Sequence, residues 1–159
     1  MQAISRSSVV VGYTPYTDSV ADLTDGKELI VSGMKQERER CMAALRRAAE
    51  GATVALVSSG DPGVYGMAGL ALELAQAHDF QCAIEIVPGV SAANAAAARL
   101  GAPLMLDYAC ISLSDLLIPW ERIRHRIELL AQADMALALY NPRSTKRVRQ
   151  LEEAVEILL

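Results

Sequence analysis

The residues best suited to chemistry lie in one glycine- and proline-rich segment, Val57-Ser-Ser-Gly-Asp-Pro-Gly-Val-Tyr-Gly66. The segment follows an apolar, β-rich run, so we expect a loop at the carboxyl end of a parallel strand, where small residues let a ligand approach the backbone closely. It holds one acid, Asp61, and no lysine or arginine, whereas a phosphate-binding loop usually carries a basic residue. The segment therefore predicts a binding loop for a ligand with hydroxyl, amine or cationic groups.

Two further turns with polar residues follow predicted strands: Pro88-Gly-Val-Ser91 and Tyr140-Asn-Pro142. The carboxyl ends of parallel strands share one edge of a sheet, and ligands bind in the crevice beside that edge. A single turn of this kind means little, because every connection from a strand to a helix needs one. Turns at three strand ends, each with a serine, aspartate or asparagine, favour a ligand cleft over ordinary connections.

Each of these polar residues also has an ordinary structural role. Asp61 can cap its own turn, and Ser91 can cap the helix that follows it. In the second case Ser91 could at the same time direct backbone N–H groups toward a ligand carboxylate, because the start of a helix is its positive end. The basic run at residues 143–149 is either a solvated helix face or a contact for a polyanionic ligand.

Apolar periodicity places these turns between alternating strands and helices. In the predicted helix 36–50, Cys41 and Leu45 mark the apolar side, and the arginines lie largely outside it. The alternation predicts an α/β fold with mainly parallel sheets and right-handed crossovers. The expected strands are 8–12, 53–57, 81–87, 109–113 and 135–140, and the expected helices are 16–23, 36–50, 65–77, 91–100, 119–131 and 144–159.

Composition narrows the function classes further. Hydrophobic residues make up 52% of the 159 residues and the net charge is −4, which argues against a general nucleic-acid surface. No apolar run approaches the roughly 20 residues of a membrane span, and no secretory signal is visible, so we expect a cytoplasmic protein outside the membrane. Motifs of serine hydrolases, dinucleotide-binding folds and phosphate loops are absent. The cysteines are widely spaced, so we expect them to act as small hydrophobic residues and to bind no metal; they are Cys41, Cys82 and Cys110.

At the two loops Ser59-Gly-Asp-Pro-Gly-Val-Tyr-Gly66 and Val87-Pro-Gly-Val-Ser-Ala92 the chain resembles the tetrapyrrole (corrin/porphyrin) methylase family. Longer segments are similar to the members that act at C17 of precorrin-3B or cobalt-precorrin-3, and the resemblance covers nearly the whole chain. These segments are Val11-Gly-Tyr-Thr-Pro-Tyr16, Gly101-Ala-Pro-Leu104, Asp107-Tyr-Ala-Cys-Ile-Ser-Leu-Ser-Asp-Leu-Leu117 with Pro119-Trp-Glu121, and Tyr140-Asn-Pro-Arg-Ser-Thr-Lys-Arg147.

The resemblance implies two α/β domains with S-adenosylmethionine between them. The first domain would cover residues 1–108 and the second would begin at 109–159. Both domains are expected to be truncated, because the family's opening strand with its glycine turn and the later half of the second domain are not seen. By the same resemblance, the cofactor would be lined by Ser59, Gly60, Asp61, Val64, Ser91, Ala92, Tyr140 and Asn141.

The reaction that the resemblance implies is methylation of C17 of the macrocycle together with ring contraction, a step of cobalamin biosynthesis. The resemblance also implies that the enzyme is a homodimer. The substrate carries many carboxylates, which favours Arg143, Lys146 or Arg147 as contacts, and Asp107 and Tyr65 are candidates for proton handling. One departure is Leu106, where the family pattern has a histidine before the aspartate. Two alternatives remain: a methylase acting at another ring carbon, or a truncated, inactive fragment that at most binds a partner.

Overall fold

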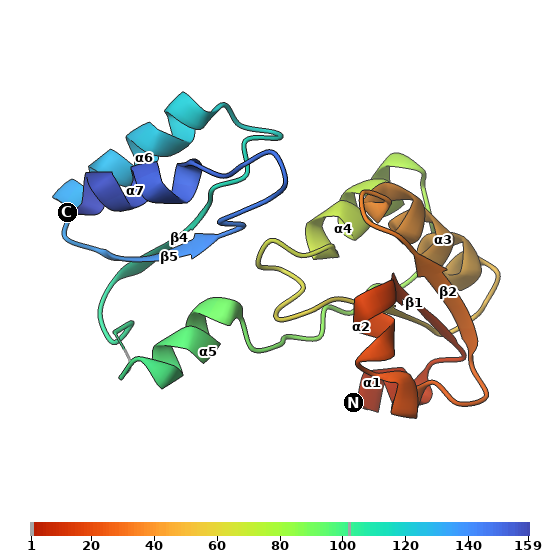
Figure 1. The fold of residues 1–159 in the computed structure, drawn as a ribbon. Helices are drawn as coiled ribbons and strands as arrows, with labels where there is room; N and C mark the ends of the chain where they lie inside the picture. Colours follow the sequence, from red (N-terminus) through yellow and green to blue (C-terminus); the bar gives the residue numbers. More distant parts are fainter. Residues whose placement is uncertain (1, 102) are drawn as a thin grey trace. The chain divides into compact units, whose positions relative to one another are not determined.

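The computed structural model describes residues 2–101 and 103–159, which form two compact units, Met1–Ser91 and Ala92–Leu159 (Figure 1). Ala102, within the segment 101–104 that carries part of the family resemblance, lies outside the described residues. The units divide at residue 91, whereas the sequence predicts a domain boundary at 108, which stays a prediction.

The first unit is built on a parallel sheet of order β2-β1-β3. Strand β1 lies in the middle, and its Val9 is in register with Glu28 of β2 and Val54 of β3. Helices or turns connect successive strands, as parallel pairing requires. The elements are α1 (Gln2–Arg6), β1 (Val9–Tyr13), α2 (Thr14–Asp18), the 3-10 turn η1 (Ala21–Leu23), β2 (Glu28–Ser32), α3 (Glu37–Ala49), β3 (Val54–Val57) and α4 (Ala68–Ala77).

Burial explains why β1 occupies the central position. Its valines at 9, 10 and 11 are at most 1% exposed, and such β-branched runs are typical of strands covered on both faces. Helix α3 packs on β1 and β3 and against α4, where Cys41 and Leu45 meet Leu74 (Figure 1). Complete burial of a side chain the size of leucine stabilises the fold by about 1.5–3 kcal/mol, so this cluster holds the sheet and its following loops in place.

The second unit pairs β4 and β5 in parallel, with Tyr108 in register with Ala136. Helices α6 and α7 pack on each other, and Leu113, Ile123, Ile127 and Ala154 form a core that is at most 2% exposed. The spacing from Ile123 to Ile127 places both on one face of α6. The elements are α5 (Ala92–Arg99), β4 (Tyr108–Ser112), α6 (Trp120–Gln132), β5 (Ala136–Tyr140) and α7 (Gln150–Leu158).

The predicted α/β class and the parallel pairing are confirmed, whereas three local predictions are wrong. Residues 81–87 form no strand, although Ile84 still packs against the core of the first unit. Helix α7 begins at Gln150 rather than at Ser144. The predicted helix 16–23 is split between α2 and η1, and β2 at 28–32 was not expected at all.

No helix in the part of the chain that the structure describes is long and apolar enough to cross a bilayer. Among the same residues, no group of three or more histidine, cysteine, aspartate or glutamate side chains could hold a metal ion. Cys41 is fully buried in the core between α3 and α4, and Cys82 and Cys110 are half-buried.

Candidate functional site

The first unit brings two of the predicted loops together, residues 58–67 and 87–91, which we call the loop pair. The carboxylate of Asp61 joins them: Oδ1 accepts the N–H of Gly63 at 2.8 Å, and Oδ2 accepts the N–H of Gly89 at 3.0 Å. These backbone donors, Gly89 first and Gly63 next, lower the pKa of the Asp61 carboxyl below its usual value. Asp61 therefore holds the geometry of both loops as a carboxylate.

The glycines of the loop pair allow the two backbones to touch. A Cβ on Gly89 would lie 2.2 Å from the carbonyl oxygen of Gly60, and a Cβ on Gly66 would lie 2.4 Å from that of Pro62. Gly60 has a φ of +64°, a conformation that other residues adopt only with strain. The sequence suggested that these small residues admit a ligand, whereas the structure uses them first for contact between loop backbones.

Several predicted cofactor residues lie on the accessible part of the loop pair. Ser59 and Gly60 are exposed, and Val64 and Ser91 are half-buried. Tyr65 is 52% exposed with a φ of +52°, an uncommon conformation for a residue with a large side chain. The loop pair thus presents small residues and backbone groups, with one aromatic ring beside them.

The second unit gathers the other predicted residues around the end of β5. The hydroxyl of Tyr140 accepts the N–H of Ala93 at 3.0 Å, which joins the first turn of α5, where Ala92 lies, to β5. Asn141 has a φ of +51°, and its Nδ2 donates to the Oγ of Ser112 at the end of β4 at 2.9 Å. Ala92, Tyr140 and Asn141 are thus linked within this unit.

Arg147 fixes the loop that follows Asn141. Its side chain is buried, and Nε donates to the carbonyl oxygen of Asn141 at 3.0 Å. One guanidinium nitrogen lies 3.4 Å from the Oγ of Ser114 and 3.6 Å from Oδ1 of Asp115. Asp115 is also a neighbour of Gln150, whose Nε2 donates to Oδ2 at 3.3 Å. The guanidinium of Arg147 therefore contacts acceptors within the protein, although the sequence favoured Arg147 as a contact for the substrate.

A second buried arginine was missed by sequence reasoning, which placed it on the solvated side of its helix. Arg40 of α3 is 3% exposed, and it donates to the Oγ of Ser32 and the carbonyl oxygen of Gly33, both at 2.7 Å. It also lies 3.4 Å from the sulfur of Met67 and 5.6 Å from the centre of the Tyr13 ring. Arg40 thus connects the ends of β1 and β2 with the last residue of loop 58–67.

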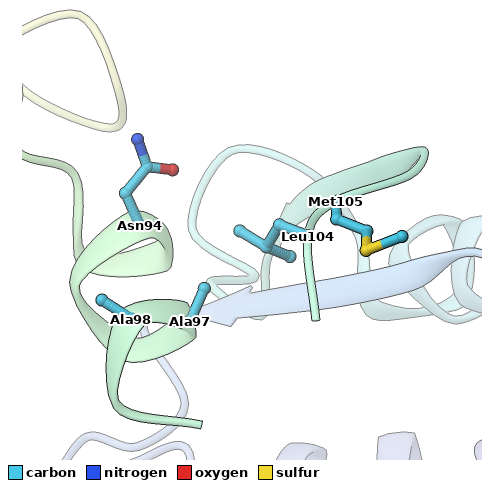
Figure 2. A pocket seen from close by; sticks show the side chains of 5 residues that line it. All are labelled: Asn94, Ala97, Ala98, Leu104 and Met105. Atoms are coloured by element: carbon cyan, nitrogen blue, oxygen red, sulfur yellow. The ribbon is translucent and has the colours of Figure 1, made fainter. Parts of the chain in front are cut away.

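Helix α5 borders a small apolar hollow of about 290 Å³, lined by Asn94, Ala97, Ala98, Leu104 and Met105 (Figure 2). In Figure 2 the side chain of Leu104 extends toward helix α5, and that of Met105 extends away from it. None of the predicted site residues lines the hollow. Leu106 and Asp107 come directly after Met105 in the sequence, and both are exposed. The proton-handling role of Asp107 stays a prediction.

A comparison with protein families matches residues 1–159 to the model described as Tetrapyrrole (Corrin/Porphyrin) Methylases. The chain is 47% identical over 158 residues to a probable cobalt-factor III C(17)-methyltransferase of Salmonella typhimurium, covering 99% of this chain and 66% of the relative. It is 43% identical over 160 residues to a precorrin-3B C(17)-methyltransferase of a Sinorhizobium species, covering 99% of this chain and 63% of the relative. The chain thus spans less than two thirds of either relative.

Among solved structures, the crystal structure of the methyltransferase CobJ superposes with a TM-score of 0.92 at 42% sequence identity. The match covers 99% of this chain and 66% of that structure. Both described units, with the loop pair and the residues around Tyr140, therefore lie within the matched part.

Proposed function

We propose that this chain, which belongs to the tetrapyrrole (corrin/porphyrin) methylase family, forms part of an enzyme that transfers a methyl group from S-adenosylmethionine to C17 of a precorrin-3B or cobalt-factor III type macrocycle. The names of the Salmonella and Sinorhizobium relatives support the substrate. The observation that carries the proposal is the loop pair, in which the two family-like cofactor loops are joined through Asp61.

The residues of the loop pair fit a cofactor with amine, hydroxyl and sulfonium groups. The exposed residues Ser59 and Gly60 offer polar groups for contacts, and neither loop contains a lysine or arginine that would repel a cation. The carboxylate of Asp61 gives the loop pair a negative charge, and the lowered pKa of Asp61 favours this charged form. S-adenosylmethionine would supply, when bound, a sulfonium methyl group whose carbon a nucleophilic carbon of the substrate attacks, in line with the departing thioether sulfur.

Such a displacement depends on alignment more than on a strong acid or base. This requirement matches loops that are held by hydrogen bonds: Asp61 fixes the loop pair in the first unit, and Asn141 fixes a turn within the second unit. Contraction of the macrocycle needs proton transfer in addition. Tyr65 and Asp107 remain our candidates for that step, because both are exposed and both carry an exchangeable proton or an accepting oxygen.

The experiment that tests the proposal is calorimetric titration of the full protein encoded by the gene with S-adenosylmethionine, followed by incubation with the tetrapyrrole. We expect saturable binding and a product that has gained one methyl group in place of a hydrogen. An isotope label in the donor methyl group would locate the new carbon by NMR. A folded protein that binds no S-adenosylmethionine would overturn the proposal, and label at another ring carbon would favour the alternative methylase.

The proposal includes a homodimer in the cytoplasm and a domain division at residues 108/109. Dimerisation is expected from the family resemblance, and sedimentation of the purified full protein at several concentrations measures it. Limited proteolysis that cuts between residues 100 and 110 would support the predicted boundary, and cleavage confined to other loops would argue against it.

A further inference from the structure

We infer that the loop after β5, residues 141–149, is a recognition surface for the carboxylate arms of the macrocycle, through the exposed side chains of Arg143, Lys146 and Arg149. We call it the basic loop. The inference rests on the proposed function for the identity of the ligand, and on the charges and contacts of the second unit for its location.

The basic loop concentrates positive charge in an acidic chain. It contains no acid and four of the 15 lysines and arginines, whereas the whole chain has a net charge of −4. Arg143, Lys146 and Arg149 are all exposed. Within residues 2–101 and 103–159, none of the three takes part in an ion pair. Their charges are therefore available to an anion from outside the unit.

Two acids that contact or follow the basic loop, Asp115 and Glu153, already have partners. Asp115 lies 3.6 Å from the buried guanidinium of Arg147 and accepts a hydrogen bond from Gln150. Glu153 in the first turn of α7 accepts the indole N–H of Trp120 at 2.8 Å. Glu152 is exposed in the same turn, where the positive end of the helix favours a carboxylate. The loop thus keeps a positive field toward solvent.

The brace inside the loop distinguishes it from a flexible charged segment. Arg147 donates to the carbonyl oxygen of Asn141, and its own N–H donates to the Oγ of Ser144 at 3.0 Å. The N–H of Ser144 in turn donates to the carbonyl oxygen of Arg147 at 2.9 Å. One buried cation therefore holds a turn that carries the exposed ones, which lowers the entropy lost when they bind an anion.

The position of the loop and the chemistry of the substrate agree. The loop begins directly after Tyr140, at the carboxyl end of β5, which is the edge at which ligands of parallel sheets bind. A corrinoid precursor carries several acetate and propionate arms, and guanidinium and ammonium groups pair with carboxylates through charge-assisted hydrogen bonds. The exposed cations are thus suited to orient a polycarboxylate ring rather than the sulfonium cofactor.

The test compares two double variants of equal charge in the full protein encoded by the gene. Arg143→Gln/Lys146→Gln removes two cations of the basic loop. Arg122→Gln/Arg126→Gln removes two exposed cations of α6 that also lack an ion pair among the described residues. The probe is an octacarboxylate porphyrin, titrated by its absorbance at low and high salt, and a porphyrin with neutral, hydroxyl-terminated arms is the ligand control.

We expect the loop variant to bind the octacarboxylate porphyrin about 3- to 10-fold more weakly at low salt, since each exposed ion pair contributes a modest amount. The difference should shrink at high salt, because exposed charges are screened. The α6 variant and the neutral porphyrin should show no such change. Equal weakening in both variants, or no weakening in the loop variant, would overturn the inference.

Calorimetry with S-adenosylmethionine on the same samples separates the two proposals. A loop variant that binds the cofactor normally but the octacarboxylate porphyrin weakly supports the recognition surface. A wild-type protein that binds the porphyrin through the loop, yet binds no cofactor and transfers no methyl group, would contradict the proposed function and leave the surface intact.

Discussion

Two loops in different units follow the end of a strand, and each is held by one charged side chain of opposite sign. After β3, the carboxylate of Asp61 accepts the N–H groups of Gly63 and Gly89. After β5, the guanidinium of Arg147 donates to the carbonyl oxygen of Asn141 and approaches Ser114 and Asp115. Asp61 is half-buried, whereas Arg147 is buried.

The difference follows from the backbone groups that each turn leaves without a partner. The glycine turns of the loop pair direct N–H groups inward, so an acceptor with two oxygens satisfies both loops. The turn after β5 directs a carbonyl oxygen inward, so a donor satisfies it, and the planar guanidinium reaches several acceptors at once. A charged side chain therefore holds each loop. Its sign follows from the backbone groups that it binds, which are N–H groups in the loop pair and a carbonyl oxygen after β5.

The largest expected effect comes from removing the buried tether. Arg147→Met should lower the free energy of unfolding by about 2–3 kcal/mol, because the carbonyl oxygen of Asn141 loses its donor and Asp115 loses its buried counter-ion. Urea unfolding measures the change. Arg143→Met is the control, since that side chain is exposed and should alter stability by less than about 0.5 kcal/mol. Equal effects of the two substitutions would remove the distinction between the braced residue and its exposed neighbour.

A smaller effect should come from forcing the loop pair apart. In Gly89→Ala, the new Cβ would lie 2.2 Å from the carbonyl oxygen of Gly60, which is backbone and cannot rotate away. We expect a loss of about 1–3 kcal/mol and weaker binding of S-adenosylmethionine.

Gly69→Ala is the matched control for that substitution. Gly69 lies within α4 with nothing near the position of a Cβ, so alanine there should stabilise the protein by about 0.5–1 kcal/mol. The two changes add the same methyl group and should shift the unfolding midpoint in opposite directions. A neutral result at Gly89 would mean that the loops are not in contact.

The smallest effect should be a pH dependence carried by Asp61. Its pKa is lowered in the folded state by the N–H groups of Gly89 and Gly63, so its contribution to stability is present above the unfolded pKa of about 3.9 and is lost as the pH falls through the lower folded value. Asp61→Asn should therefore be less stable than the wild type at neutral pH, and the gap should narrow below about pH 4. Thermal unfolding across this range measures it, and a constant gap would argue against the carboxylate tether.

Sequence patterns were sufficient where local chemistry decides the structure. The buried valines of β1 and the apolar face of α3 were visible as runs and periods, and the strand–helix alternation implied parallel pairing. The edge strand β2 was not predicted, although it holds the apolar run Leu29-Ile-Val31; in the sheet it is largely exposed. Residues 81–87 were apolar enough to predict a strand. A β-strand, however, also needs a neighbouring strand to pair with, and this segment forms no strand in the structure.

The contacts that build the candidate site could be predicted only in part. The turn residues stood out by type, so both loops of the loop pair were found. Their junction joins Asp61 and Gly89, which are 28 positions apart, and no local pattern reports such a partner. Arg40 was assigned to the solvated side of its helix, and Arg147 to a solvated face or a substrate contact, because arginine usually lies at the surface. The strand ends and turns of the fold instead supply acceptors that bury both.

Hydrogen exchange of the loop pair, with and without S-adenosylmethionine, tests the central claim most directly. The claim is that the two loops joined by Asp61 form one wall of the cofactor site. We predict slower exchange in peptides covering residues 58–67 and 87–91 when S-adenosylmethionine is added, and loss of this protection in Gly89→Ala. Cofactor that binds by calorimetry yet leaves the exchange of both peptides unchanged would contradict the claim.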